Sequence, residues 1–256
     1  MFLGIDIGSS SSKVAIVDEN KNVVAAKVVN MGTGTNGADV AMQAALDEAG
    51  ITLEDVKYIV ATGYGRLKFD KADVQITEIS CHAKGVQTLV PDADTIIDIG
   101  GQDAKVIRLA GGQVENFIMN EKCAAGTGRF LEVMSRVLNT DLKDLSALAD
   151  QSTKALAISS VCTVFAESEV ISSLAAGEAL ADVARGANFA IAKRVAGMCK
   201  RVGTGKKIVM TGGVALNDNM VRSMAAELGQ EVTAVPHCQV VGAIGAAIFA
   251  HEKYHK

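Results

Sequence analysis

Proline and long apolar runs are scarce in this sequence of 256 residues, and the chain has no net positive charge. Only 2 Pro occur, and hydrophobic residues make up 49% against 21% charged residues, a composition that is typical of a compact fold and excludes extensive disorder. The formal net charge of -4 offers no cationic surface to a phosphate backbone or to an anionic membrane. We therefore expect neither nucleic acid nor a membrane as a partner.

No segment predicts export or membrane insertion. Charged residues interrupt every apolar run well short of the roughly 20 residues that span a bilayer. Residues 1–6 have no basic leader and carry a carboxylate. The 5 Cys are odd in number and widely spaced, which argues against a disulfide framework and leaves reduced thiols or metal ligands. We expect a cytoplasmic protein.

A short internal repeat indicates that the chain is duplicated. Residues 2–14 read FLGIDIGSSSSKV and residues 95–106 read TIIDIGGQDAKV. In both, an apolar strand ends in Asp-Ile-Gly, and a lysine follows the aspartate at the same spacing. Each copy continues into two further strand-like runs around a polar turn, which predicts a three-strand meander at the start of each half.

Helical periodicity follows each meander. The pattern also predicts single strands at 56–61 and 207–211. This alternation indicates an α/β protein with two homologous lobes. The predicted helices cover 38–49, 77–90, 126–138, 142–149, 165–176, 180–202, 215–228 and 240–251.

The first hairpin has the composition of a phosphate-binding loop. After Asp6, a glycine and small hydroxyl residues let backbone N–H groups approach an anion, and a lysine adds positive charge. A tight structural hairpin would have the same residues. The candidate phosphate-binding residues are Gly8, Ser9, Ser10, Ser11, Ser12 and Lys13.

The second hairpin repeats this device after Asp98. Two carboxylates, Asp6 and Asp98, cannot lie beside a polyphosphate without a cation, so Mg²⁺ held largely through water is implied. We expect both to surround this ion and the attacking water, with strand-end turn residues as the alternative. In the second loop Gln102 and Asp103 are candidates to orient the water or a phosphate oxygen. The candidate residues of this loop are Gly100, Gly101, Gln102 and Asp103.

A glycine pair, Gly212 and Gly213, ends a later strand, and Asn217 follows it. A nucleoside base can lie against such a turn, although a tight strand-to-helix connection explains the glycines as well. Two phosphate hairpins followed by this pair, over a duplicated α/β frame, resemble the actin, Hsp70 and sugar-kinase superfamily of ATP-binding proteins. The resemblance implies a two-lobe fold with ATP in the cleft, the lobes being 1–92 plus 239–256 and 93–238.

Two cysteines, Cys123 and Cys162, stand where helices are predicted to begin. Helix N-termini favour anions and stabilise thiolates. Two thiolates fill only half of a tetrahedral or cubane site, and a two-fold axis would complete four ligands from two chains. Buried, inert cysteines in a packing of Ala- and Gly-rich helices are the alternative.

Longer motifs make the resemblance specific. Together they resemble the activators, or component A, of 2-hydroxyacyl-CoA dehydratases, to which ATP-binding subunits of benzoyl-CoA reductase are related. The likeness covers essentially the whole chain. The motifs are TGYGR at 62–66, EISCHA at 78–83, IDIGGQD at 97–103, CAAGTGRFLE at 123–132, CTVFAESEVIS at 162–172 and TGGVALN at 211–217.

This resemblance implies a homodimer that holds one [4Fe-4S] cluster through Cys123 and Cys162 of both subunits and binds ATP or ADP in each. It implies that the protein accepts an electron from ferredoxin or flavodoxin and uses ATP hydrolysis to deliver it at low potential to a dehydratase or a related iron–sulfur acceptor. There the electron starts the radical chemistry by which water leaves a 2-hydroxyacyl-CoA. We expect ATP, bridging both hairpins, to favour a transfer-competent arrangement that ADP relaxes.

Two other functions fit the same fold. A small-molecule kinase, of the sugar or pantothenate type, would use Asp98 as a base, although no set of sugar-reading residues stands out. Alternatively, the four cysteines of a dimer hold a structural Zn²⁺. Visible absorption after anaerobic purification separates an iron–sulfur protein from these two, because both are colourless.

The remaining reactive residues have open or incidental roles. Tyr64 and Arg66 either reach the nucleotide or a partner, or pack on the surface. We interpret Glu167 and Glu169 as stabilising the start of a helix rather than as partner contacts. We also expect three thiols to be small buried residues and the four histidines to form no cluster. These are Cys81, Cys199 and Cys238, and His82, His237, His251 and His255.

Overall fold

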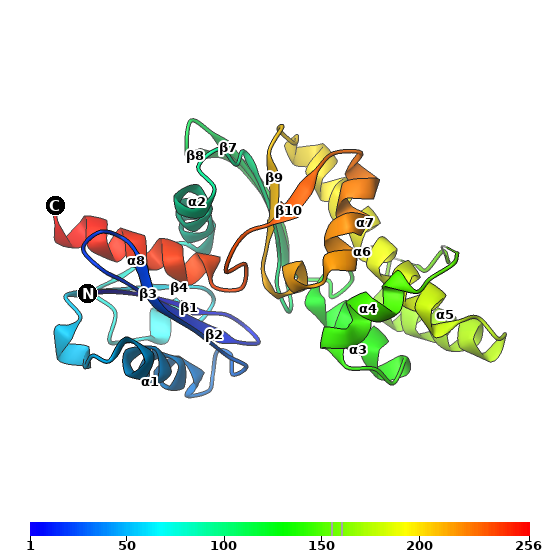
Figure 1. The fold of residues 1–256 in the computed structure, drawn as a ribbon, viewed down its shortest axis with the longest axis horizontal. Helices are drawn as coiled ribbons and strands as arrows, with labels where there is room; N and C mark the ends of the chain where they lie inside the picture. The colour runs from blue at the N-terminus through cyan, green and yellow to red at the C-terminus, as the bar shows by residue number, and fades with distance from the viewer. Residues whose placement is uncertain (155, 160) are drawn as a thin grey trace. The chain divides into compact units, whose positions relative to one another are not determined.

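Two five-stranded sheets organise the chain in the computed structural model, which describes residues 1–154, 156–159 and 161–256. Each sheet is the centre of one compact unit, and Figure 1 labels most of the helices and strands of both. The first unit comprises Met1–Ala93, Leu109–Val114 and Pro236–Lys256. The second unit comprises Asp94–Arg108 and Glu115–Val235.

The sheet of the first unit has the order β3-β2-β1-β4-β5. β1 pairs antiparallel with β2 and parallel with β4. All six residues of β1 are buried, as expected for a strand that is covered on both faces. The strands are β1 (Phe2–Ile7), β2 (Ser12–Val17), β3 (Val23–Val29), β4 (Tyr58–Thr62) and β5 (Val74–Gln75).

Helices cover both faces of this sheet. Leu3 and Ile5 of β1 belong to the core beneath α1, whereas Phe2 belongs to the core beneath α8. The division follows from the alternation of side chains along a strand. Helix α2 packs against α8 in turn. The helices of this unit are α1 (Gly37–Ala49), α2 (Glu78–Leu89) and α8 (Val241–Tyr254).

The sheet of the second unit repeats the pattern of the first. Its order is β10-β9-β6-β7-β8, and the central β6 pairs antiparallel with β7 and parallel with β9. Asp98 lies opposite Lys105, as Asp6 lies opposite Lys13 in the first unit. The duplication predicted from the sequence is thus confirmed. The strands are β6 (Thr95–Ile99), β7 (Ala104–Ala110), β8 (Gln113–Asn120), β9 (Ile208–Thr211) and β10 (Val232–Ala234).

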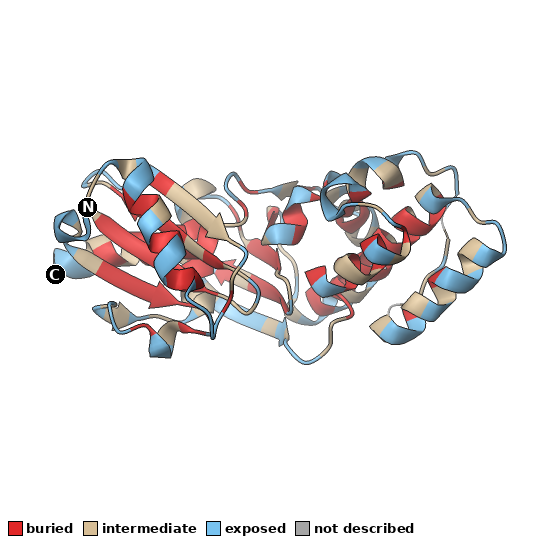
Figure 2. Ribbon diagram, turned by 90° about the horizontal axis from the view of Figure 1, so that it is seen from below, coloured by how far each residue is buried: buried red, intermediate tan, exposed pale blue. Residues whose placement is uncertain are grey.

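The helices of the second unit differ greatly in burial. α6 is buried along most of its length, whereas only Ala166 and Val170 are buried in α5 (Figure 2). Among the described residues, no helix combines the length and the apolar character that crossing a membrane requires. The helices are α3 (Gly128–Val137), α4 (Leu145–Asp150), α5 (Thr163–Ala175), α6 (Leu180–Val202) and α7 (Asp218–Leu228).

Capping residues explain where the observed helices depart from the predicted ones. The helix expected from residue 126 begins at Gly128, because Thr127 has extended backbone angles and serves as its N-cap. The helix expected from residue 215 begins at Asp218, because the side chain of Asn217 accepts the N–H of Met220. The short strands β5 and β10 are not predicted, since two or three residues carry too little periodicity.

Candidate functional site

Each candidate phosphate hairpin contains an ion pair between a buried aspartate and a lysine. In the first unit, Lys13 Nζ lies 3.2 Å from Asp6 Oδ2, and Asp6 is 3% exposed. In the second unit, Lys105 Nζ lies 3.3 Å from Asp98 Oδ2, and both residues are buried. A charge removed from water needs such a partner, so each lysine is placed to pair with its aspartate at the end of a strand.

The carboxylate of Asp98 has a second partner, and Lys105 contacts a second carboxylate. Thr211 Oγ1, at the end of β9, donates to Asp98 Oδ1 at 2.8 Å. Lys105 Nζ also lies 2.8 Å from Asp103 Oδ2, so one ammonium joins two carboxylates of the loop. The candidate residues Asp98 and Asp103 therefore lie together. The sequence repeat contained Lys105, but its role as their shared partner was not recognised there.

Gly212 brings the glycine pair against this hairpin. Its φ of +85° is in the left-handed region that favours glycine. A Cβ at Gly212 would lie 2.3 Å from the carbonyl oxygen of Ile99 and 2.9 Å from Asp98 Oδ1. Only a residue without a side chain permits this approach, so Gly212 and Asp98 share one site. Gly213 is exposed beside them.

Two of the predicted ligand residues are engaged within the protein. Ser12 is fully buried, and its hydroxyl donates to the carbonyl of Met31 at 2.8 Å. Asn217 caps α7, and its amide nitrogen donates to Asn188 Oδ1 at 3.3 Å. Their side chains support the loops. The hydroxyls of Ser9, Ser10 and Ser11 lie on residues that are partly or fully exposed, as does the side chain of Gln102.

A backbone contact joins the second hairpin to the start of α3. The N–H of Gly128 donates to the carbonyl of Gly100 at 2.8 Å, and the N–H of Arg129 donates to the carbonyl of Gly101 at 2.8 Å. These are two of the four N–H groups that a helix leaves unpaired at its N-terminus. A Cβ at Gly128 would lie 3.0 Å from the oxygen of Gly100, so the approach is tight. The contact was not predicted from the sequence.

Cys123 lies in the loop that precedes α3. Asn120, the last residue of β8, fixes this loop, because its amide donates to the carbonyls of Cys123 at 2.9 Å and Ala125 at 3.1 Å. The expectation that Cys123 stands at a helix start is wrong, because the N-cap of α3 is Thr127. The backbone of Cys123 is therefore held by a side-chain amide.

Cys162 is the N-cap residue of α5, as the sequence predicted. Its carbonyl accepts the N–H of Ala166 at 3.0 Å. The side chain of Glu169, two turns into the helix, accepts the N–H of Ser159 at 2.9 Å. Glu169 therefore holds the loop that leads into Cys162, a role distinct from the helix stabilisation that we expected.

The two cysteine loops lie beside each other in the second unit. Cys123 Sγ lies 3.9 Å from the carbonyl oxygen of Val161, the residue before Cys162. Both cysteines are partly exposed, which contradicts the alternative of inert thiols in a dry interior. Apolar side chains around them face solvent, since Val161, Val164 and Phe165 are 72%, 65% and 68% exposed. Such an exposed apolar patch marks an interaction surface.

The other three cysteines are buried, as predicted. Burial raises the pKa of the Cys81 thiol to about 12 and that of the Cys199 thiol to about 12. Burial thus disfavours the thiolate, the form that binds iron or zinc, at these two positions. Cys123 and Cys162 are therefore the candidate ligands.

The residues present include two of the four thiols that a four-thiolate site needs. They also include a carboxylate that can contact a hydrated cation. The sulfur of Cys123 lies 3.9 Å from the carbonyl oxygen of Val161, and Cys162 is the N-cap residue of α5, where the helix favours negative charge. In the first unit, Asp6 Oδ1 is buried and has no hydrogen-bond partner among the described residues. A water bound to Mg²⁺ would satisfy that oxygen.

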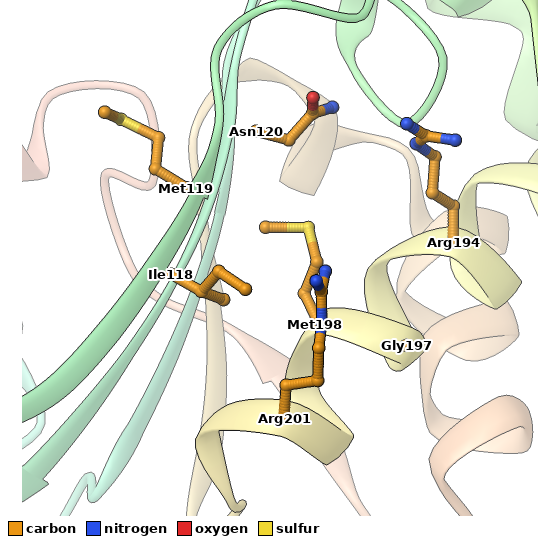
Figure 3. Close-up of a pocket in the computed structure, with 7 residues that line it drawn as sticks. All are labelled: Ile118, Met119, Asn120, Arg194, Gly197, Met198 and Arg201. Atoms are coloured by element: carbon orange, nitrogen blue, oxygen red, sulfur yellow. The ribbon is translucent and has the colours of Figure 1, made fainter.

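A pocket of about 430 Å³ lies between β8 and α6, on another flank of the Cys123 loop. The side chains of Ile118 and Met198 extend toward each other across it, and Asn120 lies at its edge (Figure 3). The arginines on its wall are Arg194 and Arg201. The pocket thus touches the residue that fixes the cysteine loop.

The TGYGR segment lies against the end of β1, because the N–H of Gly65 donates to the carbonyl of Ile7 at 2.9 Å. Arg66 Nη1 donates to the carbonyl of Gly63 at 2.9 Å, which closes the turn after β4. Tyr64 is 46% exposed. A Cβ at Gly63 would lie 2.4 Å from Asp6 Oδ1, so this segment adjoins the first hairpin.

Known proteins share both the sequence and the fold of this chain. An activator of lactoyl-CoA dehydratase from Anaerotignum propionicum is 53% identical over 255 residues, which is 99% of this chain and 98% of that protein. The activator of 2-hydroxyisocaproyl-CoA dehydratase from Clostridium difficile, solved with bound ADPNP, is 45% identical with a TM-score of 0.97 and covers 100% of this chain and 96% of that one.

More distant structures show the fold alone. A ROK family glucokinase from Streptomyces griseus is 16% identical, with a TM-score of 0.61 over 98% of this chain and 99% of that one. The predicted actin- and sugar-kinase-like fold is thereby confirmed. The model of the BadF/BadG/BcrA/BcrD ATPase family matches residues 3–250. The chain, with its two candidate phosphate hairpins and its adjoining cysteine loops, belongs to the BadF/BadG/BcrA/BcrD ATPase family.

Proposed function

We propose that this protein is an ATP-driven one-electron activator of a 2-hydroxyacyl-CoA dehydratase or of a related iron–sulfur acceptor enzyme. Relatives that are 53% and 45% identical bear the names of such activators. The observation that carries the proposal is the pair of hydrogen bonds from Gly128 and Arg129 to the carbonyls of Gly100 and Gly101. It joins a nucleotide loop to the segment that contains a candidate cluster ligand.

The two hairpins provide the nucleotide chemistry in this proposal. Backbone N–H groups around Gly8 and Gly100, with the hydroxyls of the serine loop, bind phosphate oxygens. Asp6 and Asp98 hold water molecules of Mg²⁺, and Lys105 keeps Asp98 ionised and in place. Gln102, exposed on the second loop, orients the attacking water. Gly212 and Gly213 line the nucleoside, while Ser12 and Asn217 act as supports.

Cys123 and Cys162 provide the ligands for the electron-carrying group. One chain offers two thiols where a [4Fe-4S] cluster takes four, so two copies related by a dyad hold one cluster as a homodimer. When bound, the cluster supplies one-electron transfer at low potential. The residues of the chain place the thiols: Asn120 fixes the first cysteine loop and Glu169 fixes the second. Ferredoxin or flavodoxin supplies the electron in this scheme.

The start of α3 couples these two chemistries. A change of phosphate contacts at Gly100 and Gly101 shifts the carbonyls that hold Gly128 and Arg129. Cys123 lies only one short loop before Gly128, so its position and exposure change with the helix. Hydrogen bonds and exposure set the potential of a thiolate-bound cluster. For a one-electron couple, about 59 mV is a tenfold change in the equilibrium, so a small displacement is sufficient.

The kinase alternative has less support. The likeness to the glucokinase is 16% in sequence and shows the fold alone. The two cysteine loops, which lie together and are partly exposed, have no task in phosphoryl transfer to a small molecule.

The test is activation of a dehydratase by protein purified without oxygen. Dehydration of a 2-hydroxyacyl-CoA is followed with a low-potential reductant, with and without ATP. We expect activity only with ATP, and we expect the Asp98→Asn variant to retain its iron but to lose activation by at least about 100-fold, because its Mg²⁺ and water contacts are lost. Asp141→Asn, an exposed position, is the matched control. Activation without ATP, or by an iron-free protein, would contradict the proposal.

A further inference from the structure

The sequence His251-Glu252-Lys253-Tyr254-His255 places two imidazoles four residues apart at the end of α8. Residues four apart lie on one face of a helix, and this His-Glu-x-x-His spacing is one by which two histidines bind zinc. The expectation that the histidines form no cluster is wrong. The ring centroids of His251 and His255 are 4.6 Å apart, since the last helical turn brings them together.

A carboxylate from the turn between β2 and β3 completes the group. Glu19 Oε2 lies 3.0 Å from His255 Nε2 and 3.9 Å from His251 Nε2. One ligand atom of each residue lies within 4.8 Å of the others. Two ligands of a tetrahedral zinc ion are about 3.3 Å apart at ordinary Zn–N and Zn–O distances. Small side-chain rotations therefore bring all three atoms to one ion.

The backbone and the neighbouring rings hold the three ligands in place. Asp18 accepts the N–H groups of Asn20 and Asn22, each at 2.8 Å, which fixes the turn that carries Glu19. The His251 ring packs edge-on against Phe2, with centroids 4.8 Å apart. A metal site needs ligands that are ordered before binding, and these contacts supply that order.

The charges around the group define its chemistry. Lys57 Nζ lies 2.6 Å from Glu19 Oε1, so it takes one carboxylate oxygen and leaves Oε2 toward the histidines. Glu19 Oε2 lies 3.0 Å from His255 Nε2, so the second oxygen is placed for an ion shared with the imidazoles. The C-terminal end of α8 also favours a cation.

We propose that Glu19, His251 and His255 bind one divalent transition-metal ion of the Zn²⁺ type. Two imidazoles and one carboxylate are ligands that suit zinc, nickel and copper better than magnesium or calcium. Binding requires the neutral tautomer of His251 that carries its proton on Nδ1, and Nε2 then turns from the carbonyl of Glu19, which it contacts at 3.0 Å. Three protein ligands leave a fourth position for water.

The proposed site has ligands for a metal ion, but it has no glutamate placed to act as the general base of a metalloprotease. Glu252 occupies the position of the catalytic glutamate in that motif. Its Oε1 lies 3.1 Å from Lys84 Nζ and 3.4 Å from Lys21 Nζ, so lysines hold the carboxylate that would activate water. All of these residues belong to the first unit, so the inference stands independently of the function proposed for the cysteine loops.

Calorimetric titration with Zn²⁺ tests the site on the complete, anaerobically purified protein at pH 7.5, with its iron content measured before and after. We expect one Zn²⁺ per chain, and an affinity at least about tenfold weaker in Glu19→Gln and in His255→Gln, since losing a ligand costs no less than losing an outer-shell partner. His237→Asn is the matched control, because His237 is exposed with φ +57° and Asn tolerates that conformation.

The imidazole proton resonances of the wild-type protein provide a second measurement, which does not depend on whether any variant folds. We expect Zn²⁺ to shift the signals of His251 and His255 and to leave that of His237 unchanged. No saturable Zn²⁺ binding, an unchanged affinity in both ligand variants, or a shift confined to other histidines would each overturn the proposal.

Discussion

The N–H of Gly128 donates to the carbonyl of Gly100 at 2.8 Å, so the first residue of α3 is tied to the second phosphate hairpin. The first unit has the same device, since Thr33 N–H donates to the carbonyl of Gly8 at 2.8 Å. In both copies, a residue in the segment that follows the three-strand meander donates a backbone hydrogen bond to the carbonyl of the hairpin glycine. Only the second copy carries a cysteine, Cys123, in that segment.

This comparison indicates how one fold serves two tasks. In the first copy the segment after the meander leads directly into α1 and only supports the hairpin. In the second copy it also contains Cys123, which lies beside the loop of Cys162. Under the proposed function, a response to phosphate at Gly100 would therefore reach a thiol in the second copy alone.

Replacing either exposed cysteine should remove the cluster. We expect Cys123→Ser and Cys162→Ser to lose the visible absorption and nearly all iron after anaerobic purification, because each homodimer loses two of four thiolates. Absorption spectra and iron analysis measure this. Cys238→Ala, at a buried position, is the control and should keep its colour. A coloured double variant of Cys123 and Cys162 would refute the ligand assignment, and a colourless wild type that contains zinc would favour the structural Zn²⁺ alternative.

Glu169 should control the lifetime of the cluster. Its side chain accepts the N–H of Ser159 at 2.9 Å, and a hydrogen bond to a charged group contributes about 1.5–3 kcal/mol when it is shielded from water. We expect Glu169→Ala to release iron severalfold faster than the wild type while keeping its helical content, because the loop before Cys162 loses its anchor. Glu167→Ala, on the same helix, is the matched control. Equal iron release from both variants would show that the anchor is unimportant.

Acid should weaken the second unit through Asp182. This carboxylate accepts the N–H of Lys154 at 3.1 Å, the hydroxyl of Ser152 at 2.8 Å and the N–H of Thr153 at 2.9 Å. The bond from Lys154, followed by that from Ser152, holds the pKa of Asp182 below its ordinary value. A lowered pKa contributes stability above the unfolded value of about 3.9, which is lost as the pH falls through the folded value.

We therefore expect the free energy of unfolding of Asp182→Asn to be lower than that of the wild type by a constant amount above about pH 5. The difference should shrink below about pH 4, where the wild type also loses the charge. Denaturant unfolding at a series of pH values measures it, and Asp141→Asn at an exposed position should show no such change. A difference that stays constant down to pH 3 would assign the effect to a cause other than the charge.

Sequence patterns correctly predicted the helices and hairpins that are determined by one continuous segment of the chain. The repeat of aspartate, glycine and lysine predicted both hairpins, and helical periodicity predicted α6 at 180–202 as observed. The places where helices begin were less certain, because Thr127 and Asn217 set them through backbone angles and one capping bond. Periodicity reports which face is buried and does not report such caps.

Contacts between distant segments could not be predicted in the same way. The bond between Gly128 and Gly100 and the site of Glu19 with His251 and His255 join residues from different elements. A single sequence contains no signal that shows which glycine contacts which helix. The His-Glu-x-x-His spacing was a visible signal, but its third ligand depends on the fold of the first unit.

The rate at which a chelator removes iron from the reduced protein tests the coupling through α3 most directly. This rate is measured under three conditions: with Mg²⁺ and ATP, with Mg²⁺ and ADP, and without nucleotide. The proteins compared are the wild type, Gly128→Ala and Gly197→Ala. Gly197→Ala is the control, because a Cβ at Gly197 would meet no neighbouring atom. The account predicts that ATP changes the rate of iron removal severalfold in the wild type and in Gly197→Ala. It predicts that Gly128→Ala still binds ATP but loses most of this response, because the new Cβ crowds the oxygen of Gly100. Equal rates in all three nucleotide states of the wild type, or a full response in Gly128→Ala, would contradict it.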